Sequence, residues 1–311
     1  MVATRLKKKH GGSLLLQNYR SHPWLYFMIL PVLAYYIIFH YIPMYGLIIA
    51  FENYKPTRGV LHSEWVGFKW FAQFINGPFF GRLVRNTISI NIKLLLVGFP
   101  MPILFALLLN EVRSVKFRKV VQTVTYMPHF VSTVVICGLM VIFCRTDGIL
   151  TWALSHFGMP KTNILSIAKY FQPLYVGMNI WQELGWDSII YFAALTAVDA
   201  SLYEAATVDG AGRWRCMWHV TLPGILPTIV VLLILRIGHL LSLGWDRIYL
   251  LYSEIVYETA DVISTYVYRT GLVQFQYSYA SAVGIMNSVV NIVLLLGANA
   301  LSRKINDTSL W

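Results

Sequence analysis

The sequence predicts an all-α, polytopic membrane protein with about six transmembrane helices, a short cytoplasmic helix, and both termini on the inside. Of its 311 residues, 57% are hydrophobic and 13% are charged, whereas an ordinary soluble domain carries about 25% charged residues. Mean hydropathy is +0.58. This composition excludes a soluble globular enzyme. The net charge of +11 does not indicate a nucleic-acid partner, because such a surface comes with a polar composition; lysines and arginines in cytoplasmic loops explain it.

Six stretches are long and apolar enough to cross the hydrocarbon core of a bilayer, which takes about 20 residues. They are residues 24–47, 86–109, 120–143, 172–198, 223–245 and 279–301. Prolines inside these spans predict kinks or broken turns, which membrane helices tolerate; they are Pro31, Pro43, Pro100, Pro102 and Pro227.

A basic segment, residues 1–23, precedes the first span in the manner of a signal peptide. The apolar run that follows is too long for a signal peptide and lacks a small-residue cleavage site, so we expect an uncleaved first span. The chain then divides into this basic tail, a transmembrane domain over 24–301, and a C-terminal tail over 302–311.

The distribution of Lys and Arg predicts the orientation of the spans. With a cytoplasmic N-terminus, the inside segments carry a dense basic set: Arg5, Lys7, Lys8, Lys9, Arg20, Arg113, Lys116, Arg118, Lys119, Arg213, Arg215, Arg303 and Lys304. The outside segments spread their basic residues over a longer total length: Lys55, Arg58, Lys69, Arg82, Arg85, Arg145, Lys161, Lys169, Arg247 and Arg269. Both termini are therefore expected inside.

The three cysteines, Cys137, Cys144 and Cys216, have neither the number of a disulfide framework nor metal-ligand spacing. We expect reduced, structural cysteines and no metal site.

The loop at 199–223 carries the most informative local pattern. Ser201 followed three residues later by Glu204 is a capping box, which predicts the start of a helix. Asp209-Gly210 predicts its end, because glycine accepts a left-handed conformation. A second short helix is expected over 213–219, with Pro223 in the first turn of the next span. The small residues of the first helix suit docking into a cleft of a partner protein, and an ordinary loop helix is the alternative.

The same loop resembles the EAA loop of bacterial ABC-importer permease subunits. The matching residues are Glu204, Ala205, Ala206, Gly210, Val220, Leu222 and Pro223, with Val220 where the pattern most often has Ile. Further stretches are similar to carbohydrate-uptake permeases of the lipoprotein/polysaccharide and aldouronate type: 39–46, 107–113, 121–129, 256–262 and 310–311. The resemblance covers nearly the whole chain and is weakest over 145–170.

This resemblance implies the passive half of a pump that imports oligosaccharides across a bacterial cytoplasmic membrane. The implied partners are a second, related permease subunit, two ATP-binding subunits and an extracytoplasmic solute-binding protein. The loop helix, with Asp209 at its end, then serves as the coupling helix that docks on an ATP-binding subunit. The sequence contains no G-x-x-x-x-G-K-[ST] phosphate loop, so ATP and Mg are expected on the partner and no cofactor or catalytic residue on this chain.

Polar side chains inside spans are costly and are candidates for the substrate path. Glu183 and Asp187 lie four residues apart, on one helix face, while Trp181 and Trp186 offer flat faces that stack on sugar rings. An aromatic belt with a solvated helix end is the alternative. The full set of candidates is Lys93, Asn179, Trp181, Glu183, Trp186, Asp187, Arg236 and Asn287.

These candidates divide by charge. Lys93 and Arg236 are expected as internal counter-ions of Glu183 or Asp187, and a bolder hypothesis is that they favour acidic saccharides such as uronate oligomers. Asn287 and Asn291, four apart, equally fit hydrogen bonds between helices.

Two other classes of protein compete with this interpretation. An ion-coupled secondary transporter would use Glu183 and Asp187 as carriers but leaves the 201–223 loop without a purpose. An intramembrane enzyme needs a motif such as H-E-x-x-H or G-x-S-x-G, and neither occurs. The outer segments 48–85 and 246–278 are the expected docking sites for the binding protein, with packing on their own bundle as the alternative.

Overall fold

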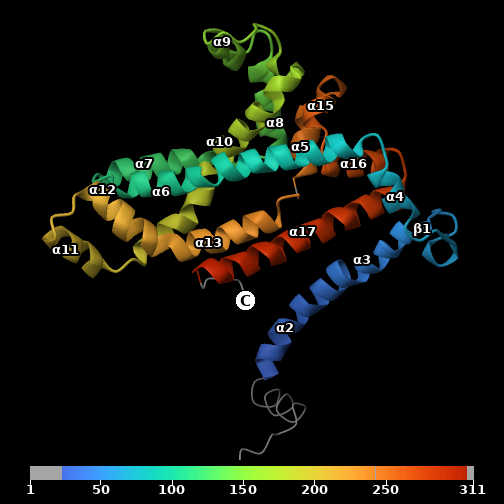
Figure 1. Cartoon of the computed structure of the whole chain (residues 1–311), viewed down its shortest axis with the longest axis horizontal. Coiled ribbons are helices and arrows are strands. Elements are labelled where there is room, and N and C mark those ends of the chain that lie inside the picture. The colour runs from blue at the N-terminus through green and yellow to red at the C-terminus, as the bar shows by residue number, and fades with distance from the viewer. Residues whose placement is uncertain (1–22, 242, 307–311) are drawn as a thin grey trace, which may run out of the picture.

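The computed structural model describes residues 23–241 and 243–306. The basic tail through residue 22 and the closing residues 307–311 lie outside this range. The helices α5, α6, α7, α13 and α17 run roughly along the long axis, and α8 and α9 project to one side (Figure 1). The first helical segment, α2 and α3, diverges from this bundle, and α11 lies at one end of the long axis (Figure 1). The described part is therefore almost entirely helical, as predicted.

The elements follow one another with short connections. Those of the first half are α2 (Pro23–Tyr36), η1 (Ile37–Tyr41), α3 (Ile42–Met44), η2 (Tyr45–Phe51), β1 (Glu52–Asn53), η3 (Val60–His62), β2 (Glu64–Trp65), α4 (Lys69–Ile75), α5 (Phe80–Lys93), η4 (Leu94–Gly98), α6 (Pro100–Asn110), α7 (Val115–Tyr126), η5 (Met127–Phe130), α8 (Thr133–Cys144) and α9 (Ile149–Ser155). Those of the second half are η6 (Ile164–Ser166), α10 (Ala168–Thr196), α11 (Ala200–Val208), α12 (Arg213–Cys216), η7 (Met217–Thr221), α13 (Leu222–Gly238), α14 (Trp245–Leu251), η8 (Glu254–Val256), α15 (Tyr257–Ala260), α16 (Ile263–Tyr268), η9 (Arg269–Val273) and α17 (Tyr277–Asn306). The two short strands pair antiparallel, with Glu52 opposite Trp65.

Four helical stretches are long and apolar enough to cross a membrane, and two bent helix pairs bring the total to as many as six. The four are Trp24–Phe51, Phe80–Asn110, Arg213–Gly238 and Tyr277–Arg303, and the bent pairs are Val115–Phe130 with Thr133–Cys144 and Ala168–Thr196 with Ala200–Val208. Each overlaps one predicted span. The first stretch has none of its most apolar window buried, so its apolar side chains face away from the rest of this chain.

The predicted third span, 120–143, is not one straight helix. Its two parts meet at 99°, because Pro128 lies in the short 3₁₀ turn η5 and Ser132 then starts a new helix by accepting a hydrogen bond from the Val135 N–H at 3.4 Å. The predicted fifth span, 223–245, is also displaced. Its helix begins at Arg213 and ends at Gly238, because apolar composition locates a span better than it locates the ends of its helix.

Prolines within the helices coincide with irregular turns. Pro43, Pro100 and Pro223 each lie two residues after the end of a π-helical turn, η1, η4 and η7 respectively. A proline ring clashes with the carbonyl four residues earlier, and in all three cases that carbonyl lies inside the wider turn, which closes instead by a bond between residues five apart, such as Phe99 N to Leu94 O at 3.0 Å. The helices therefore continue through these prolines.

Helix α10 lies at the centre of the packing, against α6, α7, α13 and α15. Its close approach to α7 depends on Gly185, where a Cβ would clash with the Thr125 carbonyl oxygen. Fully buried residues such as Phe171 and Ile225 join α10 and α13 to their neighbours. The helix that carries most of the predicted substrate-path residues is thus fixed on several sides.

Candidate functional site

Three of the candidate residues on α10 share one face. Asn179, Glu183 and Asp187 follow one another at four-residue spacing and line the same hollow of about 220 Å³. Trp181 lies on another face, half exposed, against the apolar residues of α8 and α9. The structure therefore separates Trp181 from the polar candidates.

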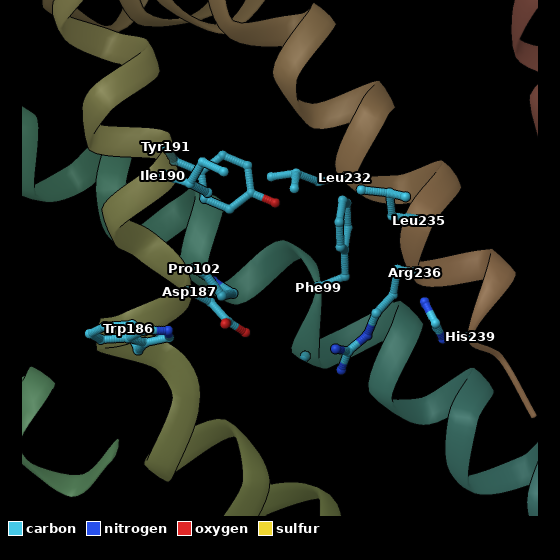
Figure 2. Close-up of a pocket in the computed structure, with 11 residues that line it drawn as sticks. Phe99, Pro102, Trp186, Asp187, Ile190, Tyr191, Leu232, Leu235, Arg236 and His239 are labelled. Atoms are coloured by element: carbon cyan, nitrogen blue, oxygen red, sulfur yellow. The ribbon is translucent and has the colours of Figure 1, made fainter. Parts of the chain in front are cut away.

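A larger hollow of about 460 Å³ adjoins this face. It is lined by Gly98, Phe99, Pro102, Trp186, Asp187, Ile190, Tyr191, Leu232, Leu235, Arg236 and His239. Its walls thus come from Gly98 of η4 and from α6, α10 and α13, and the close-up shows side chains of these three α-helices around the hollow (Figure 2). A mostly apolar wall with a few polar groups is the usual make-up of a ligand site.

Asp187 and Arg236 point toward each other from opposite walls of this hollow (Figure 2). Within the described residues, neither side chain forms a hydrogen bond or an ion pair. The attraction between them therefore acts across open space. Arg236 also lines the 220 Å³ hollow and a third one of about 340 Å³ toward α14. The same arginine therefore borders all three hollows.

Both carboxylate oxygens of Glu183, in contrast, have partners. Its Oε1 accepts a hydrogen bond from Arg247 Nη2 at 2.7 Å, and its Oε2 lies 2.7 Å from His129 Nδ1. Arg247 Nη1 also donates to Asn179 Oδ1 at 2.6 Å. Our expectation that Lys93 or Arg236 pairs with Glu183 is wrong, because α14 folds back after the end of α13 and brings Arg247 to α10.

Trp186 is part of the same arrangement. Its indole stacks on the His129 ring with centroids 4.3 Å apart and planes inclined by 2°, and Phe130 contacts it edge-on. Because 42% of Trp186 remains exposed and it lines the 460 Å³ hollow, one of its faces supports His129 while the residue still borders the space.

Lys93 and Asn287 form no part of these hollow walls. Lys93 donates to Gln172, which in turn donates to the Thr259 carbonyl at 2.8 Å. Asn287 donates to the Leu241 carbonyl at 3.2 Å, and Asn291 accepts from the Leu241 N–H at 2.9 Å. These side chains therefore join helices, which for the two asparagines is the alternative that the sequence left open.

The loop helix α11 is present where the sequence predicts it, but it starts differently. Asp199, not Ser201, is the N-cap, and its Oδ1 accepts from the Ser201 N–H at 2.9 Å. That hydrogen bond lowers the pKa of the Asp199 carboxyl. Gly210 has φ +76°, the left-handed conformation predicted at the helix end. No residue of α11 is buried, so the segment with Glu204, Ala205 and Ala206 is open to a partner.

The second predicted loop helix, 213–219, is not separate. α12, η7 and α13 form one continuous stretch from Arg213 to Gly238, so Val220, Leu222 and Pro223 lie inside a long helix rather than at the start of a span. Thr221, buried within it, accepts a hydrogen bond from the Tyr203 hydroxyl at 3.0 Å. Tyr203 thus joins α11 to the continuous helix that carries Arg236.

Comparison with known proteins decides the family. Residues 98–307 match the model for the binding-protein-dependent transport system inner membrane component. The chain belongs to this family. It is a multi-pass subunit of the inner membrane, and this membership argues against the ion-coupled and intramembrane-enzyme alternatives.

Similar proteins extend the match to almost the whole chain. The polygalacturonan/rhamnogalacturonan transport system permease protein YteP of Bacillus subtilis (strain 168) is 46% identical over 98% of this chain and 95% of its own length. Protein LplB of the same organism is 45% identical over 93% of this chain and 91% of its own length. A crystal structure of a bacterial ABC transporter involved in the import of the acidic polysaccharide alginate contains a chain 45% identical to this one, with a TM-score of 0.86 over 94% of this chain and 99% of that one.

His129 and Arg247 were not among the residues that we expected in the path. His129 follows Pro128 at the break between η5 and α8, and Arg247 follows Gly244 after the end of α13. An imidazole directly after a helix-breaking proline is the sequence signal that could have identified His129, whereas Arg247 lies three residues after Gly244 and has no comparable local signal.

Proposed function

We propose that this chain is the transmembrane subunit of an ATP-driven importer of acidic oligosaccharides, with the α10–α13 hollow as its share of the path. The observation that carries the proposal is Arg236, a cation that borders all three hollows and has no ion-pair partner among the described residues. A guanidinium binds carboxylates in a two-point geometry, and Trp186 offers an aromatic edge to a sugar ring.

The named relatives support an acidic substrate. One is described by polygalacturonan and rhamnogalacturonan transport, and the alginate importer by an acidic polysaccharide. Both descriptions concern polymers that carry uronate carboxylates. An arginine without an ion-pair partner in the described part of a chain this similar to both suits the same chemistry.

The partners and the energy source form the second part of the proposal. A related permease subunit completes the path, an extracytoplasmic binding protein delivers the saccharide, and two ATP-binding subunits hold ATP and Mg. The crystal structure of the alginate transporter with an alginate pentasaccharide-bound periplasmic protein supports such a delivery step. In this arrangement α11 is the cytoplasmic coupling helix, because none of its residues is buried and it is joined to the helix that continues into α13 through Tyr203 and Thr221.

The test is uptake by the complete transporter reconstituted in liposomes. We expect Arg236→Gln to reduce uptake of a galacturonate oligomer by about tenfold, which is the effect of losing one charge-assisted hydrogen bond of roughly 1.5 kcal/mol. Uptake of the methyl-esterified oligomer, which lacks the carboxylates, should change little. Equal uptake of acidic and neutral oligomers by the unaltered transporter would refute the acidic-substrate proposal.

A further inference from the structure

Two arginines that line the 220 Å³ hollow differ in whether they have a partner. Arg236 has no hydrogen-bond or ion-pair partner among the described residues, whereas Arg247 is held by Glu183 at 2.7 Å and by Asn179 at 2.6 Å. Both line the same 220 Å³ hollow. The group that occupies Arg247 is a carboxylate, which is the same group that an acidic saccharide carries.

We propose that Glu183 is an internal substitute for the substrate, and that the Glu183–Arg247 pair is a latch which a substrate carboxylate opens by exchange. The incoming carboxylate first meets Arg236 and then replaces Glu183 on Arg247, which leaves the amide contact between Arg247 and Asn179 as the remaining link of the latch between α14 and α10. This inference rests on the proposed acidic substrate and adds the residues that detect it.

The accessibility of the pair permits such an exchange. The side chains of Arg247 and Glu183 are 21% and 25% exposed, so both border the hollow rather than lying sealed beneath it. Replacing one carboxylate by another keeps the arginine paired throughout, which avoids the cost of a lone buried charge. Asn179 remains as the second acceptor on Arg247.

The released carboxylate also keeps a partner. Glu183 Oε2 lies 2.7 Å from His129 Nδ1, and the His129 ring is held in place by its stack on Trp186. Glu183 can therefore leave Arg247 without becoming an isolated charge. The cost of opening the latch is correspondingly small.

Weakening this link would affect the outer connection of the path, because the Glu183–Arg247 ion pair is the charged contact between α10 and α14. α14 is seven residues long and follows Gly244. Its other contacts are a hydrogen bond from Cys137 Sγ to the Arg247 carbonyl at 3.8 Å and apolar packing: Ile248 is buried, and Trp245 stacks on Tyr268 with centroids 4.1 Å apart. A short helix held to α10 by one ion pair and one amide contact is suited to two positions.

The experiment measures ATP hydrolysis by the complete transporter in lipid nanodiscs without any saccharide. If the latch restrains the resting state, Glu183→Gln should raise this basal hydrolysis by about fivefold or more, the usual size of a coupling between two states. Arg247→Gln should raise it similarly and remove the extra stimulation that a galacturonate pentamer gives over its methyl ester. The matched control is Asp147→Asn, the same chemical change in an exposed pair with Arg145, which should leave basal hydrolysis unchanged.

A second measurement needs no variant. Hydrogen exchange of residues 245–251 in the unaltered transporter should increase when the pentamer-loaded binding protein and ATP are added, and not with the methyl ester. Unchanged basal hydrolysis in Glu183→Gln, or unchanged exchange in 245–251, overturns the latch while uptake of the acidic pentamer still upholds the proposed function. Absence of acidic uptake in the unaltered transporter overturns the proposed function itself.

Discussion

The two ends of the molecule are built in opposite ways. Toward one end, Asp261 is fully buried and bound by two arginines: Arg269 Nη2 at 2.8 Å and Arg82 Nη2 at 3.3 Å. Thr265 adds a hydrogen bond at 3.0 Å, and Asn86, also buried, donates to the Asp261 carbonyl at 2.9 Å. This cluster ties α5 to α15 and α16.

At the other end, the helix α11 itself contributes nothing to the core. α11 has no buried residue, Val208 is 88% exposed, and the cap Asp199 lies at the surface. α11 and α16 lie toward opposite ends of the long axis (Figure 1). The Asp261 end is held together by buried contacts within this chain, whereas the surface of α11 is where we expect a partner to bind. Substitutions at the first end should therefore reduce stability, and those at the second should reduce coupling.

The largest expected effect is loss of stability on Asp261→Ala. This change leaves Arg82 and Arg269 without their common carboxylate, and breaking a buried pair by removing one partner costs about 3–5 kcal/mol. The midpoint of thermal unfolding in detergent should fall sharply. The comparison is Asp147→Ala in the exposed Arg145 pair, worth at most about 1 kcal/mol; equal shifts in the two variants would contradict the contrast between the ends.

The second effect concerns coupling rather than stability. Gly210 has φ +76°, and no neighbouring atom lies within 4 Å of the place that a Cβ would take, so the backbone conformation alone resists a side chain there. A left-handed non-glycine residue costs about 1–2 kcal/mol, and a β-branched one is more strained. We expect Gly210→Val to lower ATP-dependent uptake by about fivefold or more while the protein still inserts in the membrane.

Gly212 provides the matched control for this substitution. It also has open space around it, but its φ is −74°, which any residue adopts. Gly212→Val should therefore retain uptake. Full ATP-dependent uptake by Gly210→Val would show that the turn after α11 plays no part in coupling.

The sequence predicted the helices better than it predicted their ends. The i, i+4 spacing placed Glu183 and Asp187 on one face, and composition located each span. The bend at 99° before α8 depends on Pro128 and the Ser132 cap together, and composition averaged over a span does not resolve such a local break. At α11, Asp199 and Ser201 are both good caps, and only the folded backbone decides between them.

The site was predicted on α10 and missed on α14. Arg247 was assigned to an outer segment because the apolar run of the fifth span continues to residue 245, whereas the helix ends at Gly238 and α14 turns back toward α10. Local patterns report which residues share a helix face. They do not report which of two arginines a folded chain brings to a carboxylate, since that depends on contacts between distant segments.

The smallest expected effect is a loss of uptake when the N-cap of α11 is removed. Asp199→Ala removes the acceptor for the Ser201 N–H and should reduce uptake only a few-fold, because one helix cap is lost while the span is intact. Asp199→Asn keeps an acceptor oxygen and should behave almost like the unaltered protein.

The pH dependence of the cap follows from the lowered pKa of Asp199. The ionised cap stabilises the folded helix at neutral pH, and this contribution is lost only as pH falls through the lowered value. Uptake of the unaltered transporter relative to Asp199→Asn should therefore stay constant from pH 7 to about pH 5, above the ordinary carboxyl range. A ratio that changes within that interval would show that Asp199 is not held ionised by its cap.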